Sequence, residues 1–187
     1  MTVWRLATGR TDEVATLVVP LADQVIGSMK RFGGDGATLE WAAPMRLDAQ
    51  VGKGTKPKPL GDLGPFLPGA LVLSERAHAA FQPFLSQFGQ LLELDVSGIP
   101  HWFFNVTNLV SCIDRERSGQ RPGGTIGNEA FIDASVPVAA AVFKDPITAK
   151  VRIYVNDPGK QLLEEAAAKT GVLGMRFLRA GLAERAA

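Results

Sequence analysis

The chain has 187 residues, of which 46% are hydrophobic and 21% charged, and its formal net charge is +1. This length corresponds to one ordinary domain, and the composition is that of a globular protein with a core rather than of a disordered chain. The balanced charge lacks the basic excess or basic stripe of a nucleic-acid-binding protein. We therefore expect a single domain over residues 1–187 and no nucleic-acid partner.

Cys112 is the only cysteine. It excludes an intramolecular disulfide, so nothing in the sequence requires an oxidising compartment. The first residues, from Met1 to Leu6, lack the basic and apolar regions of a secretory signal. No apolar run reaches the roughly 18 residues that a membrane span needs. We expect a cytoplasmic protein without a membrane span.

The first third of the chain predicts short strands and an irregular segment. Val3–Thr8 and the β-branched stretch 14–21 favour strands, and residues 22–31 favour a short helix. Residues 39–47 favour a strand that Pro44 restricts to an edge or a bulge. Residues 52–69 contain repeated glycines and prolines, which predict a long irregular loop that is either functional or mobile.

The middle third predicts a helix followed by a hairpin. Ser74 is a suitable N-cap for a helix over residues 75–88, which Pro83 should kink and Gly89 should end. Residues 91–96 alternate apolar and acidic positions, as in a half-buried strand. Residues 101–106 are apolar on both faces, which predicts a central strand. Residues 107–114 are compatible with a short helix or a further strand, and residues 115–128 with a loop.

The last third predicts a hairpin, a helix and a strand. Residues 138–143 and 151–155 favour paired strands, and a helix follows with Asp157 as N-cap and Gly171 after its end. We expect this helix to bury Leu162, Leu163, Ala166 and Ala167. Residues 175–178 predict the last strand. Because regular βαβ alternation is missing, the pattern predicts an α+β fold, a mostly antiparallel β-sheet with two to three helices packed on one side.

The residues that carry catalysis are few and scattered. His78 and His101 are the only histidines, and no pair of His or Cys residues has metal-ligand spacing. Ser111 and Cys112 lie close to Asp114 but in no nucleophile motif. No glycine-rich stretch follows the phosphate-loop or dinucleotide pattern. We expect no metal, no cofactor and no enzymatic activity. A small hydrolase that uses Ser111 or Cys112 with a histidine remains the alternative.

Two charged segments are candidates for partner contact. The run Asp114-Arg115-Glu116-Arg117 is either a solvated face or the rim of a protein interface, where charge complementarity guides association. The basic cluster Lys53, Lys56 and Lys58 is either a solvated loop or a contact patch for an acidic partner. These seven residues form the predicted partner-binding set.

Residues 71–118 also carry a resemblance. The pieces Leu71-Val-Leu-Ser74-Glu-Arg-Ala77, Leu91-Leu-Glu-Leu94, Trp102-Phe-Phe-Asn105-Val-Thr107 and Ile113-Asp114-Arg-Glu-Arg117-Ser118 follow one another at close spacing. Together with Phe143-Lys144, Ile153-Tyr-Val-Asn-Asp157 and Gly174-Met-Arg-Phe177, the pattern resembles the immunity protein 11 family of bacterial polymorphic toxin systems. The resemblance spans residues 71–178, and the first 70 residues match it only loosely.

The resemblance implies a protein that binds and neutralises a cognate toxin by steric occlusion and so protects the producing cell or its kin. It brings no catalytic residues. The recurring positions map to Ser74, Asn105, Asp114, Ser118, Phe143 and Phe177. Capping and packing account for Ser74 and the phenylalanines, and Asp114 with its charged neighbours is the candidate for partner contact. A scaffold that binds a protein other than a toxin is a further alternative.

Overall fold

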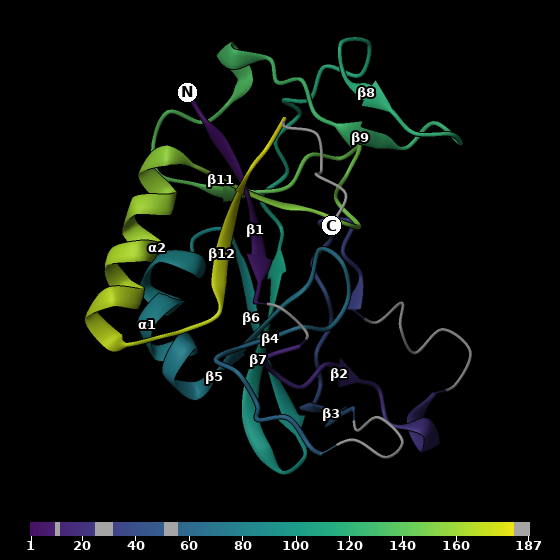
Figure 1. Cartoon of the computed structure of the whole chain (residues 1–187), viewed down its shortest axis with the longest axis vertical. Helices are drawn as coiled ribbons and strands as arrows, with labels where there is room; N and C mark the ends of the chain where they lie inside the picture. Colours follow the sequence, from purple (N-terminus) through teal and green to yellow (C-terminus); the bar gives the residue numbers. More distant parts are fainter. Residues whose placement is uncertain (10–11, 25–31, 51–55, 182–187) are drawn as a thin grey trace.

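The computed structural model describes residues 1–9, 12–24, 32–50 and 56–181 (Figure 1). Within these ranges strands outnumber helices, and most strand pairs are antiparallel. The expected mixture of strands and helices with mostly antiparallel pairing is therefore confirmed. The strands are divided among a six-stranded, a four-stranded and a two-stranded sheet, where the sequence predicted one sheet.

The six-stranded sheet is built around a central hairpin. Its strands are β2 (Leu17–Val18), β3 (Met45–Ala49), β4 (Leu63–Gly64), β5 (Leu71–Ser74), β6 (Gly89–Val96) and β7 (Ile99–Val106), in the order β2-β3-β6-β7-β5-β4. Ser97 and Gly98, with φ of 52° and 85°, form the two-residue turn between β6 and β7. β7 lies between β6 and β5, which confirms its predicted central position. β3 pairs with β6 in parallel and is an exception to the antiparallel pattern.

The four-stranded sheet joins the two ends of the chain. It has the order β10-β11-β1-β12, with β1 at Val3–Thr8, β10 at Val142–Phe143, β11 at Ile153–Asn156 and β12 at Met175–Arg179. The predicted hairpin of the last third is confirmed as the β10–β11 pair. The third sheet, β8 (Gly119–Gln120) with β9 (Ile126–Asn128), interrupts the predicted loop 115–128.

Several predicted segments differ from the structure. Residues 107–114 form neither a helix nor a strand, and they contribute only the isolated bridges Leu109–Lys144 and Ile113–Phe131. The expected helix 22–31 is represented by the short 3₁₀ helix η1 (Leu21–Asp23), and residues 25–31 lie outside the described ranges. The irregular segment 52–69 contains β4, which pairs with β5. A further 3₁₀ helix, η3, spans Asp133–Ser135.

The two α-helices begin at side-chain caps. In α1 (Glu75–Leu85) the Ser74 hydroxyl accepts a hydrogen bond of 3.2 Å from the Ala77 amide, as predicted. α1 ends before the expected residue 88, and Gly89 begins β6, where its backbone touches that of Asn105 so closely that a Cβ would collide.

In α2 (Asp157–Thr170) the cap is Asn156 and not Asp157, because the Asn156 Oδ1 accepts from the Gly159 amide at 3.0 Å. Asp157 instead accepts bonds from the Thr2 amide and the Trp4 indole. Gly171 ends the helix with φ of 70°, as expected. Leu163 is buried, whereas Leu162, predicted to be buried, is exposed.

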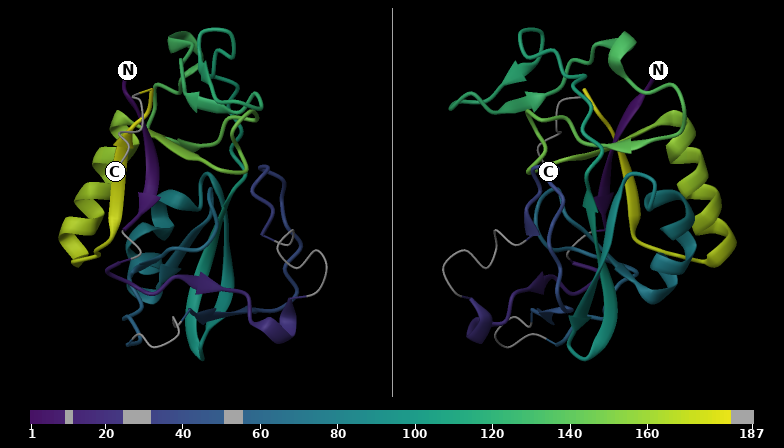
Figure 2. Two further views of the ribbon diagram at one scale, coloured as in Figure 1. Left: turned by 45° about the vertical axis from the view of Figure 1, so that its right-hand side comes forward. Right: turned by 180° about the vertical axis from the view of Figure 1, so that it is seen from behind.

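The two helices lie together on one side of the molecule, in front view and in the turned views (Figure 2). They pack on a core that both large sheets share, which includes Leu73, Phe81, Phe104, Val155 and Leu163. A second core covers the opposite face of the six-stranded sheet, and a third surrounds Tyr154 and Phe143. Neither of the two described α-helices has the length and hydropathy required to cross a bilayer.

Candidate partner-binding surface

The predicted run 114–117 is an ordered turn. The Asp114 Oδ1 accepts the backbone amides of Glu116 and Arg117, each at 3.0 Å, and its Oδ2 accepts the Arg117 Nε at 2.6 Å. The amide and then the guanidinium of Arg117 are the main causes that lower the pKa of Asp114. Arg115, Glu116 and Arg117 are exposed. The turn therefore presents charges of both signs in a fixed arrangement.

A second segment holds this turn in place. The Arg117 Nη2 donates to the Phe131 carbonyl at 3.0 Å, and the Asp114 amide donates to the Ala130 carbonyl at 2.8 Å. The Ala130 amide in turn donates to the Ser118 hydroxyl at 2.9 Å. This exchange explains Ser118, a position of the resemblance, as a link between two chain segments.

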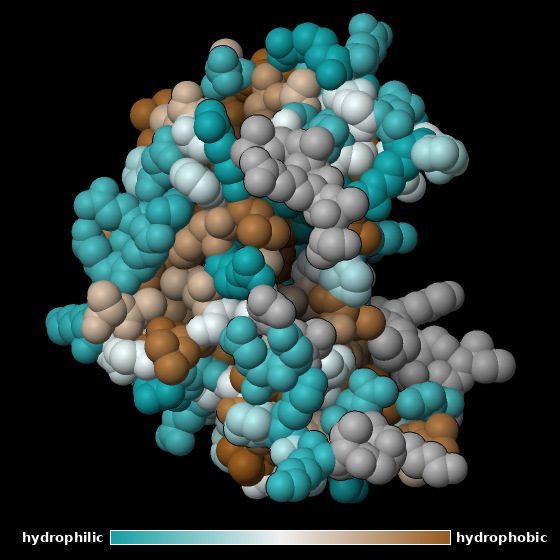
Figure 3. Space-filling model, in the orientation of Figure 1, coloured by the Kyte–Doolittle hydropathy of each residue, from teal (hydrophilic) through white to brown (hydrophobic). Residues whose placement is uncertain are grey.

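Exposed apolar side chains lie on the same segment as these anchors. Ile132 is 40% exposed and Val138 is 79% exposed. We call the residues 114–117 together with Ile132 and Val138 the upper surface, because both segments lie at the upper end of Figure 1. Figure 3 shows hydrophobic and hydrophilic residues interspersed at that end. Arginine is among the residues that are enriched in protein interfaces.

A buried ion cluster supports the upper surface from below. The Glu129 carboxylate, whose side chain is fully buried, accepts the Arg5 Nε at 2.9 Å and Nη2 at 2.6 Å, the Tyr154 hydroxyl at 2.7 Å and the Arg152 Nη1. Burial alone would raise the pKa of Glu129. The bonds from Arg5 and Tyr154 and the charge of Arg152 outweigh it and lower this pKa. Glu129 directly precedes Ala130, so the cluster fixes the base of the upper surface.

Asp145 holds the other chain segment of this base, residues 112–113. Its Oδ2 accepts the amides of Cys112 and Ile113, both at 2.8 Å, and its Oδ1 accepts the Ile147 amide at 2.8 Å. The segment that leads into the turn 114–117 is therefore attached to the end of β10. A rigid base lowers the entropy that a partner must overcome on binding.

The predicted lysine cluster does not join the upper surface. Lys56 and Lys58 are exposed and precede β4, in the part of the chain that forms the six-stranded sheet. Figure 2 shows this sheet at the lower end of the molecule and the β8–β9 sheet at the upper end. Lys53 lies outside the described residues. The structure thus separates Lys56 and Lys58 from residues 114–117.

The residues of the hydrolase alternative are also separated. His101 is buried in β7 opposite Ser74 and Leu94, and its Nδ1 lies 3.1 Å from the Ile99 carbonyl. In the described ranges neither histidine shares a hydrogen bond with Ser111 or Cys112. The hydrogen bond by which a general base would activate Ser111 or Cys112 is thus not formed among the described residues.

His78 and Cys112 have structural surroundings. The His78 ring stacks on Trp102 at 4.1 Å between centroids, and burial lowers the pKa of His78. Burial, followed by the charge of Asp145, raises the pKa of the Cys112 thiol to about 12. At neutral pH this thiol is protonated and is a poor nucleophile. Cys112 packs in the third core as a small apolar residue.

The remaining positions of the resemblance are packing or linking residues. The Asn105 Nδ2 donates to the Ala37 carbonyl at 2.8 Å and to the Gln90 Oε1 at 3.0 Å. Its buried Oδ1 accepts no hydrogen bond from the described residues. Phe143 is fully buried, and Phe177 is partly buried against the first core. Asn105 thus ties the segment before β3 to the central hairpin.

The buried cluster was not predicted from the sequence. Arg5 and Glu129 are 124 positions apart, and Glu129 lies in a polar stretch that resembles a surface loop. The one local signal is the predicted strand 151–155, which contains Arg152 and Tyr154. A charge pair between distant segments leaves no periodic trace in the sequence.

The described side chains include no group of three or more His, Cys, Asp or Glu residues arranged to hold a metal ion. No family model matches the chain. No curated protein matches it either.

Proposed function

We propose that this protein binds a cognate bacterial toxin and neutralises it by steric occlusion, as an immunity protein of a polymorphic toxin system, in the cytoplasm of the producing cell. The proposal begins from the resemblance over residues 71–178. The observation that carries it is the upper surface, where charged and apolar side chains are exposed on a hydrogen-bonded base.

The design of the upper surface suits recognition by contact. Arg115 and Glu116 extend from a turn that Asp114 orders, and Ile132 and Val138 supply exposed apolar area at the same end of the molecule. Such a surface needs no nucleophile, since covering a toxin's active region prevents its action. A stable complex of this kind buries about 1,200–2,000 Å² in total, so the upper surface would be the centre of a larger contact.

Co-expression with the toxin encoded beside this gene tests the proposal. We expect the protein to restore growth of a host that the toxin otherwise kills, and to co-purify with the toxin. Unchanged killing in the presence of the folded protein would refute it. A pull-down that captures a non-toxin protein together with unchanged killing would favour the scaffold alternative.

Surface variants locate the contact. Arg115→Glu and Val138→Asp change exposed side chains and leave the bonds of Asp114 intact, so both should reduce toxin binding at least about tenfold. Arg176→Glu on the exposed side of β12 is the matched control and should leave binding unchanged. Equal effects of Arg115→Glu and Arg176→Glu would mean that the upper surface is not the contact.

A further inference from the structure

A cavity with a volume of about 630 Å³ opens where β2 separates from β3. β2 pairs with β3 only at Ala49 and Asp48, and Pro20 and η1 then lead the chain away, so residues 45–47 of β3 extend beyond their neighbour. The cavity fills this gap, with Val19, Ala22 and Asp23 on one side and residues 39–46 on the other. We call it the edge slot.

The edge slot exposes backbone groups of β3. The Leu47 carbonyl accepts the Ser97 amide, so Leu47 directs its backbone toward β6. Backbone groups alternate in direction along a strand, and Arg46 therefore directs its N–H and C=O away from β6, into the edge slot. The antiparallel register would place Pro20 opposite Arg46. Proline has no N–H to offer the Arg46 carbonyl, and the Pro20 carbonyl accepts the Asp23 amide at 2.9 Å instead. An unpaired edge of this kind accepts an added strand.

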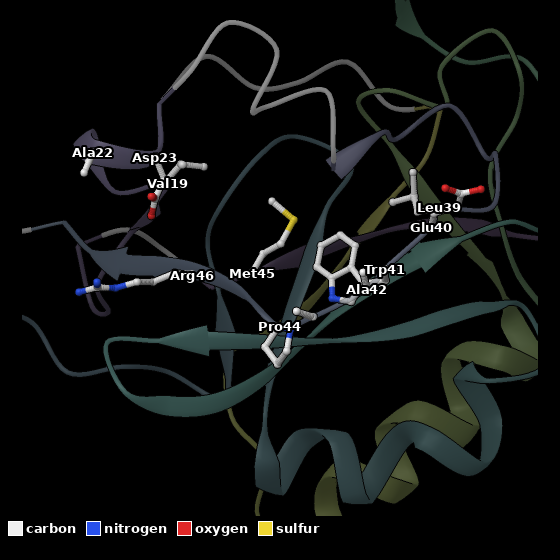
Figure 4. Close-up of a pocket in the computed structure, with 11 residues that line it drawn as sticks. Val19, Ala22, Asp23, Leu39, Glu40, Trp41, Ala42, Pro44, Met45 and Arg46 are labelled. Atoms are coloured by element: carbon white, nitrogen blue, oxygen red, sulfur yellow. The ribbon is translucent and has the colours of Figure 1, made fainter.

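Apolar and acidic side chains line the edge slot. Figure 4 shows the ring of Trp41 and the side chain of Met45 between Asp23 at one end and Glu40 at the other. The Trp41 Nε1 donates to the Glu93 carbonyl at 2.7 Å, which fixes the ring. Asp23 and Glu40 are exposed and have no ion pair in the described ranges, whereas the nearby Arg46 guanidinium lies 3.7 Å from Asp48.

We propose that the edge slot binds an extended basic segment of a partner protein, which adds a strand to β3 at Arg46. Its backbone would pair with the N–H and C=O of Arg46, and its apolar side chains would cover Trp41 and Met45. Lysine or arginine side chains at its two ends would meet Asp23 and Glu40, whose carboxylates form no ion pair with another described residue. Identifying this partner with the toxin rests on the proposed function, but the edge slot itself does not.

A short synthetic peptide tests the edge slot without the toxin. The probe is acetyl-Lys-Val-Thr-Val-Lys-amide, which spans about 17 Å when extended. At saturating peptide we expect hydrogen exchange of the Arg46 amide to slow roughly tenfold, since a new bond protects it. The same peptide with glutamates for lysines should bind at least about tenfold more weakly in calorimetry.

Variants and a modified peptide separate strand pairing from charge. Arg46→Pro removes the N–H and should abolish binding, whereas Arg46→Ala keeps the N–H and should bind. If Arg46→Pro does not fold, a probe with N-methylated valines makes the same test from the peptide side. Asp23→Lys and Glu40→Lys should each weaken binding, and Glu165→Lys on α2 should not.

Three results would overturn the proposal. The first is that saturating peptide does not protect the Arg46 amide from exchange, and the second is that the acidic peptide binds as tightly as the basic one. The third is a dimer in solution that Arg46→Pro dissociates, because a second copy of the chain would then occupy the edge slot. Because no toxin enters these measurements, failure of the co-expression test refutes the proposed function and leaves the edge slot standing. Rescue by the protein with no peptide binding refutes the edge slot alone.

Discussion

Replacing Glu129 with glutamine should destabilise the protein strongly. The substitution keeps the size of the side chain but removes the negative charge and turns one acceptor into a donor. The guanidinium groups of Arg5 and Arg152 then lose their counter-charge, and these side chains are only 11% and 10% exposed. An amide group cannot accept all the bonds that the carboxylate accepts from Arg5, Arg152 and Tyr154.

The size of the loss follows from the burial of the cluster. Removing one partner of a buried ion pair costs about 3–5 kcal/mol, because the remaining charge stays in a poorly solvated site. Domains of this size unfold with about 5–15 kcal/mol, so a single atom exchange should take a large share of the free energy of unfolding. The same exchange at Glu164, which pairs with Lys160 and is 50% exposed, should cost about 0.3–0.5 kcal/mol.

Urea unfolding followed by far-ultraviolet circular dichroism measures both losses. Because the pKa of Glu129 is lowered below 4.5, its ion pairs stabilise the fold above that pH and are lost as the pH falls through the folded pKa. The difference between wild type and Glu129→Gln should therefore shrink as the pH falls below 4.5. A loss below about 1 kcal/mol at pH 7, or no larger than that of Glu164→Gln, would refute the reasoning.

Three further outcomes follow from buried groups. The Lys144 ammonium donates to the Gly34 and Gly69 carbonyls, and burial lowers the pKa of Lys144 from 10.5 to about 8. As the pH rises from 8 to 10.5, the free energy of unfolding of the wild type should therefore rise relative to that of Lys144→Met, by at most about 3 kcal/mol. Parallel curves for the two proteins would contradict this. Cys112 should react with a thiol reagent at pH 8 only as fast as the protein unfolds, and a rate independent of added urea would show that the thiol is accessible. Gly89→Ala should cost more than about 2 kcal/mol in urea unfolding because its Cβ meets the Asn105 backbone, and a smaller loss would mean that β6 and β7 move apart easily.

Local patterns predicted the elements that local physics determines. The Ser74 cap and the glycine that ends α2, Gly171, each depend on a few neighbouring residues, and both appear where the sequence placed them. The predicted N-cap of α2, Asp157, is wrong by one residue. Asn156 and Asp157 are both good caps, and Asp157 is drawn to the Thr2 amide and the Trp4 indole, a pairing that only the folded chain brings about.

Local sequence patterns could not predict that the strands divide into several sheets. β4 has two residues and pairs with β5 inside a segment whose glycines and prolines predict a loop. The parallel pairing of β3 with β6 joins residues far apart in sequence, which alternation of apolar residues does not reveal. For the candidate site, the turn 114–117 was found from its charges, but its support by Glu129 and Asp145 depends on segments that meet only after folding.

The place of β1 in its sheet has a consequence for the order of folding during synthesis. β1 pairs on one side with β11 and on the other with β12, and the Trp4 indole bonds Asp157, 153 positions away. All strands of the six-stranded sheet lie between residues 17 and 106, so that sheet is complete in sequence long before β11 leaves the ribosome. β1 cannot pair until β11 and β12 emerge, and until then these two strands do not cover Val3 and Leu6. Such long waiting exposes a nascent chain to aggregation and to chaperones.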